Sequence, residues 1–194
     1  MGKIFYLMGK SSTGKDTIFN MLKESYPEMR SIILYTTRPI REGEDEGREY
    51  FFVGEERLAE LEAKNRVIEL RAYHTMHGTW KYFTVDDGQV DLDKFSYLVI
   101  GTLESYAGMC QYYGADKLLP IYIEVEDGVR LRRALEREKR QVRPKYSEMC
   151  RRFLADTTDF SDENLEQCGI VRRFQNHEMD ACFQEINLYI KENL

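Results

Sequence analysis

The sequence has 194 residues and a formal net charge of −6, with 42% hydrophobic and 32% charged residues. A chain of this length can bury one sizeable core but is short for two independent domains, so we expect a single domain. The composition argues against disorder, and the acidic balance argues against nonspecific binding to nucleic acid or to a membrane.

The cysteines and the lack of apolar targeting segments indicate a location. The four cysteines have no C-x-x-C pairing and no metal-ligand spacing, which is typical of reduced thiols in a cytoplasm. The sequence has neither an apolar stretch of about 18 residues nor the apolar region of a signal peptide. We therefore expect a cytoplasmic protein without a membrane partner.

The first elements in the chain are a strand, a glycine loop and a helix. Residues 3–8 are an apolar run, and helical spacing of apolar residues begins near residue 16. Gly9 and Gly14 allow the backbone to curl so that N–H groups face one anion, and Lys15 then reaches the β and γ phosphates of ATP. A glycine turn with an incidental lysine is the alternative. The predicted ATP-binding residues are Gly9, Lys10, Ser11, Ser12, Thr13, Gly14, Lys15, Asp16 and Thr17.

Asp16 stands where such a loop normally carries a hydroxyl for Mg²⁺. A bare carboxylate about 4 Å from a phosphate oxygen is repelled by roughly 4 kcal/mol at an effective dielectric of about 20, whereas a bridging Mg²⁺ reverses the sign. Thr17 offers a hydroxyl one residue later. We therefore predict Asp16 and Thr17 as metal ligands through Mg-ATP, with a solvent-pointing helix-start acid as the alternative for Asp16.

The remaining apolar runs predict a parallel sheet covered by helices on both faces, because strands and helices alternate. Further buried strands are predicted at 31–35, 97–100, 121–125 and 169–174. Helices are predicted near 103–113, 127–140, 146–157 and 178–193.

Residues 36–85 interrupt this alternation. Antiparallel strands are predicted at 50–53, 67–73 and 80–85, around a helix near 55–65. An inserted α+β lobe at about 36–85 explains the pattern, and the core then comprises residues 1–35 and 86–194.

A basic run extends from residue 130 to residue 152, with ten lysines or arginines against three acidic residues. A solvated helix face is the ordinary explanation of such a run. Within it, Pro144 disfavours helical backbone at Arg143, so we expect a loop or hinge there.

The segment YTTRPIREGEDEGREYFF, residues 35–52, contains two arginines three positions apart and a later tyrosine, which can together hold a monophosphate. With the glycine loop, this segment resembles the guanylate kinases, whose motif is T-T-R-x-x-R-x-G-E-x-x-G-x-x-Y. The similarity in pattern extends over nearly the whole chain, to Asn176. The motif positions are filled by Thr36, Thr37, Arg38, Arg41, Gly43, Glu44, Gly47 and Tyr50.

The resemblance implies an ATP- and Mg²⁺-dependent kinase that converts GMP or dGMP to the diphosphate. Glu69 falls on the family's guanine-binding glutamate, whose carboxylate accepts the guanine N1–H and N2 amino groups; an exposed strand-end acid is the alternative. Arg38, Arg41 and Tyr50 would fix the acceptor phosphate, and Thr79 would meet the rest of the base. The implied acceptor-binding residues are Arg38, Arg41, Glu44, Tyr50, Glu69, His77 and Thr79.

The resemblance also gives the basic run a role as a lid at about 133–152. Arg133, Arg137 and Arg152 would spread the charge that develops on the transferred phosphoryl group. With Lys15 and Arg38 they are the predicted catalytic residues, and no separate general base is needed.

Three positions depart from the family pattern. Leu34 replaces a serine that faces guanine, and His77 replaces a tyrosine at the acceptor phosphate. Thr102 lies where an aspartate is expected, so Asp16 or Glu104 would supply the missing carboxylate.

Two other functions remain open on the sequence. The same fold can act on another phosphorylated acceptor, such as a different nucleotide or a ribose bisphosphate. Alternatively, the chain is a non-catalytic binding module. Its expected partners are nucleotides rather than nucleic acid, and it is expected to be a monomer or a homodimer.

Overall fold

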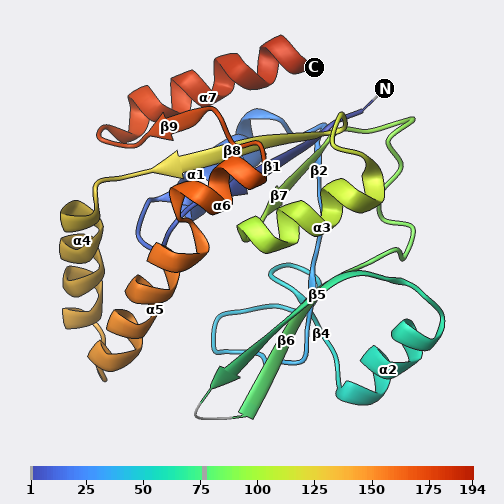
Figure 1. Ribbon diagram of the computed structural model, residues 1–194, viewed down its shortest axis with the longest axis horizontal. Helices are drawn as coiled ribbons and strands as arrows, with labels where there is room; N and C mark the ends of the chain where they lie inside the picture. The colour runs from blue at the N-terminus through green and yellow to red at the C-terminus, as the bar shows by residue number, and fades with distance from the viewer. Residues whose placement is uncertain (1, 76–77) are drawn as a thin grey trace.

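The computed structural model describes residues 2–75 and 78–194 and contains a central five-stranded sheet in the order β2-β7-β1-β8-β9 (Figure 1). Every neighbouring pair in this sheet is parallel, which confirms the predicted α/β fold class. Its strands are β1 (Ile4–Met8), β2 (Arg30–Ser31), β7 (Tyr97–Ile100), β8 (Leu118–Glu124) and β9 (Arg173–Gln175).

Helices cover both faces of this sheet, as predicted. Alternate residues of β1 contribute to two different cores because side chains of a strand point to opposite faces. Phe5 and Leu7 pack with α1 (Lys15–Ser25) and α7 (Met179–Asn193), while Tyr6 and Met8 pack with α3 (Leu103–Tyr113) and α6 (Asp162–Gln167). All five residues of β1 are buried, which explains the continuous apolar run.

A second sheet has the order β4-β3-β6-β5 and lies below the first in Figure 1. The long strands β5 and β6 form the predicted antiparallel hairpin, but β3 and β4 are parallel, contrary to the expectation of antiparallel strands. Residues 37–50 connect β3 to β4, and a crossover of this length allows a parallel return. The elements are β3 (Tyr35–Thr36), β4 (Phe51–Phe52), α2 (Glu55–Ala63), β5 (Val67–Thr75) and β6 (Gly78–Val85).

The predicted order of elements differs from the structure in one strand and one short helix. The strand predicted at 31–35 is divided, because β2 belongs to the parallel sheet and β3 to the second sheet. The short helix α6 was not predicted, since its six residues bury only Leu165 and give no apolar periodicity. Its start is set by Ser161, whose hydroxyl accepts the Asn164 N–H at 3.3 Å.

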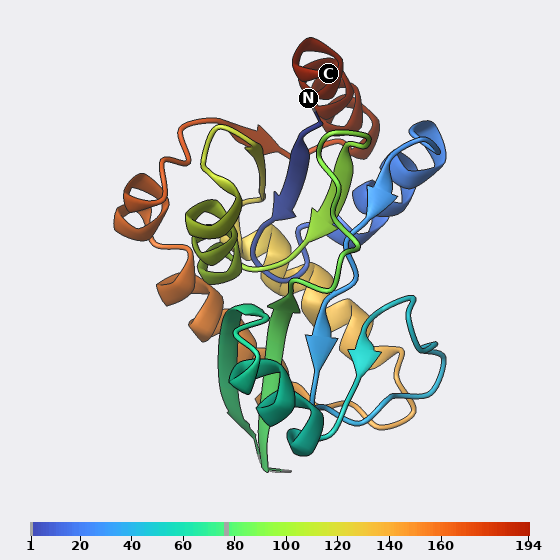
Figure 2. The same cartoon turned by 90° about the vertical axis from the view of Figure 1, so that its right-hand side faces the viewer.

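Helices α4 (Asp127–Lys139) and α5 (Tyr146–Asp159) lie side by side at the left of Figure 1, and Figure 2 shows them from the opposite flank. The connection at 140–145 contains the Arg143-Pro144 pair, where the sequence predicted a loop. Among the helices of the described residues, none combines the length and apolarity needed to cross a membrane.

Gly101, after β7, approaches the buried Tyr6 side chain so closely that a Cβ at this position would lie 2.0 Å from the Tyr6 hydroxyl oxygen. We expect Gly101→Ala to lower the free energy of unfolding by about 1–3 kcal/mol, because the added methyl group overpacks the core. In a Tyr6→Phe background the cost should be smaller, because the clashing oxygen is gone. Urea unfolding of the single and double variants measures this coupling; equal costs in both backgrounds would contradict the contact.

Candidate active site

The glycine loop joins β1 to α1, and a distant residue holds its backbone. Gly14 precedes α1 with a left-handed φ of 87°, and a Cβ there would lie 2.7 Å from Asn176 Nδ2. The same nitrogen donates a 2.7 Å hydrogen bond to the Thr13 carbonyl oxygen. Within the described residues no side chain caps α1, so the first-turn N–H groups are available to an anion.

The middle of the loop is fixed by its own contacts. The Thr13 hydroxyl donates to the Lys10 carbonyl oxygen at 3.0 Å, and Lys10 Nζ lies 3.6 Å from Asp127 Oδ1 on α4. Ser12 adopts a left-handed φ of 66°, which costs about 1–2 kcal/mol for a residue with a side chain. The loop is therefore held in a curled conformation.

Lys15 is largely withdrawn from solvent and shares its surroundings with two arginines of α4 and α5. Burial lowers the pKa of the Lys15 ammonium group, and Arg152 and Arg137 lower it further, whereas Asp16 and Asp156 act in the opposite direction. Arg152 also donates to the Ser11 hydroxyl of the loop, and both arginines are close enough to act on the charge of Lys15. A helix N-terminus and a curled backbone add to their attraction for a polyphosphate.

The two predicted metal ligands lie at the first turn of α1. The Asp16 side chain is 85% exposed and 4.0 Å from Lys15 Nζ, and Thr17 is exposed as well. No group of three potential ligands among His, Cys, Asp and Glu occurs in the part of the chain that the structure describes. One carboxylate and one hydroxyl fit a Mg²⁺ that takes its other ligands from phosphate and water. Glu104 instead lines a separate cavity with Tyr73.

A carboxylate from α5 contacts the glycine loop. Asp156 Oδ2 accepts the Ser11 backbone N–H at 2.6 Å, and Arg152 Nη2 donates to the Ser11 hydroxyl at 3.3 Å. Asp156 also lies 3.5 Å from the fully buried Arg130, which pairs with Asp127 at 3.2 Å. Neither Arg130 nor Asp156 was predicted as a site residue, because the separation of 145 residues between Ser11 and Asp156 leaves no local sequence pattern.

Arg38 is almost completely buried and is held by neighbours within the second sheet and its loop. Its two terminal nitrogens donate to the two Glu44 oxygens, each at 2.9 Å, and Nε donates to the Tyr82 hydroxyl at 3.2 Å. The Tyr50 ring centroid lies 5.7 Å from the Arg38 guanidinium carbon, and Arg41 is exposed nearby. Glu44 also accepts the Arg41 backbone N–H at 2.9 Å.

Glu69 lies in a buried polar cluster. Oε1 accepts the hydroxyls of Thr84 at 2.6 Å and Ser105 at 2.9 Å, and Oε2 accepts Arg71 Nε at 2.9 Å. Arg71 also donates to the Thr102 hydroxyl at 3.0 Å. Burial acts to lower the pKa of Arg71, but Glu69, Tyr6 and Tyr73 together outweigh it and the pKa is raised. Glu69 and Arg71 are two residues apart on β5, so the sequence alone could have predicted that their side chains lie on the same face of the strand.

Thr79, the other residue that the resemblance places at the base, does not lie beside Glu69. Thr79 pairs with His74 in the hairpin register, five residue pairs from the Glu69–Thr84 pair, or about 17 Å at the usual rise. Leu34 is buried in the core of the parallel sheet. His77 lies outside the described residues.

Helix α5 lies close to both halves of the site. Arg151 lowers the pKa of Glu148 on this helix, with smaller contributions from Arg152 and from Arg41 of the acceptor segment. One turn further on, Arg152 and Asp156 contact Ser11. The helix thus connects the surroundings of Arg41 to the glycine loop. Arg133, the third predicted lid arginine, is half-buried on α4.

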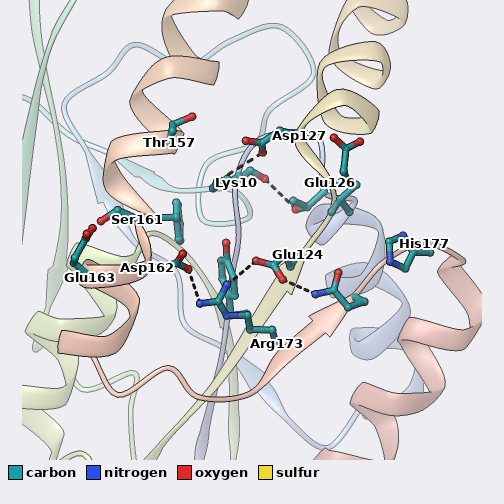
Figure 3. A pocket seen from close by; sticks show the side chains of 15 residues that line it. Lys10, Glu124, Glu126, Asp127, Thr157, Ser161, Asp162, Glu163, Arg173 and His177 are labelled. Atoms are coloured by element: carbon teal, nitrogen blue, oxygen red, sulfur yellow. Dashed lines mark hydrogen bonds and ion pairs between the residues drawn. The ribbon is translucent and has the colours of Figure 1, made fainter.

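A cavity of about 550 Å³ lies beside the loop, where Lys10 and Thr13 form part of its wall (Figure 3). Arg173 crosses it between Glu124 at 3.0 Å and Asp162 at 2.7 Å. The excess of negative charge in the cavity wall disfavours the binding of phosphate groups and favours ligand groups that donate hydrogen bonds. The carboxylates of the wall belong to Glu124, Glu126, Asp127, Asp162 and Glu163.

A parallel sheet whose first strand leads through a lysine-bearing glycine loop into a helix is the P-loop kinase fold. A crystal structure of guanylate kinase from Anaplasma phagocytophilum shares this fold with a TM-score of 0.66 and 18% identity, over 99% of this chain and 86% of that chain.

Sequence comparison leads to the same family. Residues 1–85 match the guanylate kinase family model. The guanylate kinase of Koribacter versatilis is 35% identical over 86 residues, which are 44% of this chain and 37% of that protein. The guanylate kinase of Protochlamydia amoebophila is 34% identical over 79 residues, or 40% of each. These matches span less than half of the curated relatives' length, and they show that residues 1–85 are similar to guanylate kinases.

The Arg130–Asp156 pair gives a prediction on stability. Asp156→Ala leaves a buried guanidinium with one partly exposed carboxylate, so we expect a loss of about 3 kcal/mol in the free energy of unfolding. Arg130→Leu combined with Asp156→Ala removes the buried charge as well and should recover most of that loss. Urea unfolding tests this, with Glu148→Ala as a control on the same helix; a double variant as unstable as Asp156→Ala would refute the pairing.

Proposed function

We propose that the protein transfers a phosphoryl group from ATP to a nucleoside monophosphate. The observation that carries the proposal is a glycine loop whose helix N-terminus is uncapped within the described residues. It bears the largely buried Lys15, and Arg152 contacts it at Ser11. Arg38 and Tyr50, which lie together in the second sheet and its loop, are the residues that we propose hold the monophosphate. The similarity of residues 1–85 to guanylate kinases supports the same reaction class.

In this proposal the glycine loop and Lys15 hold the β and γ phosphates of ATP. The neutral adenosine enters the acidic cavity beside the loop, whose carboxylates accept hydrogen bonds from amino and hydroxyl groups. Asp16 and Thr17 are the residues that would hold Mg²⁺ with the phosphates. The ion supplies charge neutralisation when it is bound.

Arg38, Arg41 and Tyr50 hold the acceptor phosphate. Glu44 and Tyr82 fix the plane of the Arg38 guanidinium group, and each of its nitrogens donates to one of them, so a phosphate has to displace Glu44. The exposed Arg41 is accessible at once. GMP and dGMP are the acceptors that the resemblance to guanylate kinases implies.

The arginines of α4 and α5 complete the reaction site. Arg133, Arg137 and Arg152 stabilise the charge on the transferred phosphoryl group once the α4–α5 pair closes and excludes water. Positioning and electrostatic stabilisation are sufficient for this chemistry, so no side chain acts as a general base.

Lys15→Met tests the transfer reaction. A coupled assay of ADP release with a panel of nucleoside monophosphates should show at least about a 10²-fold loss in kcat/KM, since the variant lacks the buried cation at the phosphates. Lys23→Met, which changes an exposed lysine of the same helix, should leave activity unchanged. ATP turnover by the Lys15→Met protein at the wild-type rate would rule out the proposed phosphate site.

The same variant should be more stable than the wild type. Folding lowers the pKa of Lys15, so the charged amine opposes folding at neutral pH, and a neutral side chain of similar length removes that cost. We expect a gain of about 0.5–2 kcal/mol in the free energy of unfolding. This gain, measured in urea, separates a loss of activity from a loss of folding.

A further inference from the structure

The carboxylate that would read a guanine base already has partners on both oxygens. The Glu69 side chain is only 7% exposed. Helix α3 packs closely against it, because a Cβ added to Gly108 would lie 2.6 Å from the Glu69 Cβ. Oε1 accepts from Thr84 and Ser105, and Oε2 accepts from Arg71 Nε. Arg71 Nη2 adds a second, longer contact to Oε1 at 3.3 Å. The carboxylate is therefore satisfied within the protein.

Arg71 presents the same pair of donors as guanine. Guanine offers N1–H and the N2 amino group side by side, and a guanidinium group offers Nε–H and Nη2–H in the same parallel arrangement. In the structure these two donors of Arg71 face the two oxygens of Glu69 at 2.9 and 3.3 Å. A guanine base that approached Glu69 would have to displace them.

Contacts on the far side of the guanidinium group prevent that displacement. Nη1 donates to the Thr102 hydroxyl at 3.0 Å, and Thr102 is itself the residue that caps α3. The Arg71 side chain is 5% exposed, so it has little access to water as an alternative partner. A buried charge that loses its counterion is strongly disfavoured, and Arg71 therefore stays on Glu69.

This cluster borders the acceptor phosphate site. Arg71 lies opposite Tyr82 in the β5–β6 register, and the Tyr82 hydroxyl accepts Arg38 Nε at 3.2 Å. Burial raises the pKa of Tyr50, whereas Arg71 and Arg38 both act to lower it, so the two guanidinium groups lie near the same ring. Arg71 is thus placed where the base of a nucleotide held by Arg38 would reach.

We propose that Arg71 is a specificity-determining residue that takes the place of the donor edge of guanine. The acceptor is then a phosphomonoester selected through its phosphate, without recognition of guanine. This inference rests on the proposed function, because it keeps phosphoryl transfer from ATP as the reaction. It differs in the acceptor, which is no longer selected for a guanine base.

The wild-type protein provides the first test. Its kcat/KM values with ATP and GMP, IMP, AMP, CMP, UMP or ribose 5-phosphate should show GMP within about tenfold of the best other acceptor. A site that reads guanine through a free carboxylate should prefer GMP over AMP by more than about 100-fold, because buried polar groups reject analogues that leave them unpaired. A GMP preference of that size would overturn the proposal.

Variants test the role of Arg71 itself. Arg71→Ala removes both guanidinium donors from the Glu69 carboxylate and leaves the Thr84 and Ser105 hydroxyls on Oε1. The ratio of kcat/KM for GMP to that for AMP should therefore rise at least tenfold. Arg66→Ala, which removes an exposed arginine paired with Asp86, is the matched control and should leave the ratio unchanged. An unchanged ratio in a folded Arg71→Ala protein would contradict the proposal, and the wild-type panel decides if that variant does not fold.

A binding measurement separates this inference from the proposed function. Trp80 is the one tryptophan in the sequence, and its ring lies 5.8 Å from the Arg41 guanidinium carbon, so its fluorescence reports on the acceptor site. Absence of turnover with every acceptor would refute the proposed function alone. In that case, dissociation constants of GMP and AMP that lie within tenfold of each other would still support the role of Arg71. Binding of GMP more than 100-fold tighter than that of AMP would refute it.

Discussion

Positive charge at the amino end of α1 is the constraint on which the site depends. Burial lowers the pKa of Lys15 from this helix, and Arg152 from α5 and Arg137 from α4 add to that effect. Asp16 and Asp156 offset part of the repulsion, and Asp156 at the same time holds the Ser11 backbone. The remaining charge costs stability in the free protein and provides the attraction for a polyphosphate.

The acceptor side is organised differently, because each of its buried arginines has a carboxylate of its own. Glu44 holds Arg38 through two 2.9 Å contacts, and the Arg38 guanidinium carbon lies 5.7 Å from the Tyr50 ring centroid. The Glu69–Arg71 pair occupies the carboxylate that would otherwise recognise a base. A buried arginine–carboxylate pair thus occurs both at the proposed phosphate site and at the carboxylate that the family resemblance assigns to the base.

The sequence was sufficient for features that depend on local chemistry. Glycine at position 14 and the apolar run before it predicted the loop and its flanking elements, and Pro144 predicted the break between α4 and α5. Contacts between distant segments were not predictable. The Ser11–Asp156 bond and the pairing of Thr84 with Glu69 depend on helix placement and hairpin register, which no single segment encodes.

Urea unfolding at increasing ATP concentration tests most directly whether the cations at α1 form a polyphosphate site. A ligand that binds only the folded state raises the free energy of unfolding by about 1.4 kcal/mol for each tenfold increase above its dissociation constant. We expect this dependence with ATP and a much weaker one with AMP, which lacks the β and γ phosphates. A free energy of unfolding that does not change with ATP would contradict the account.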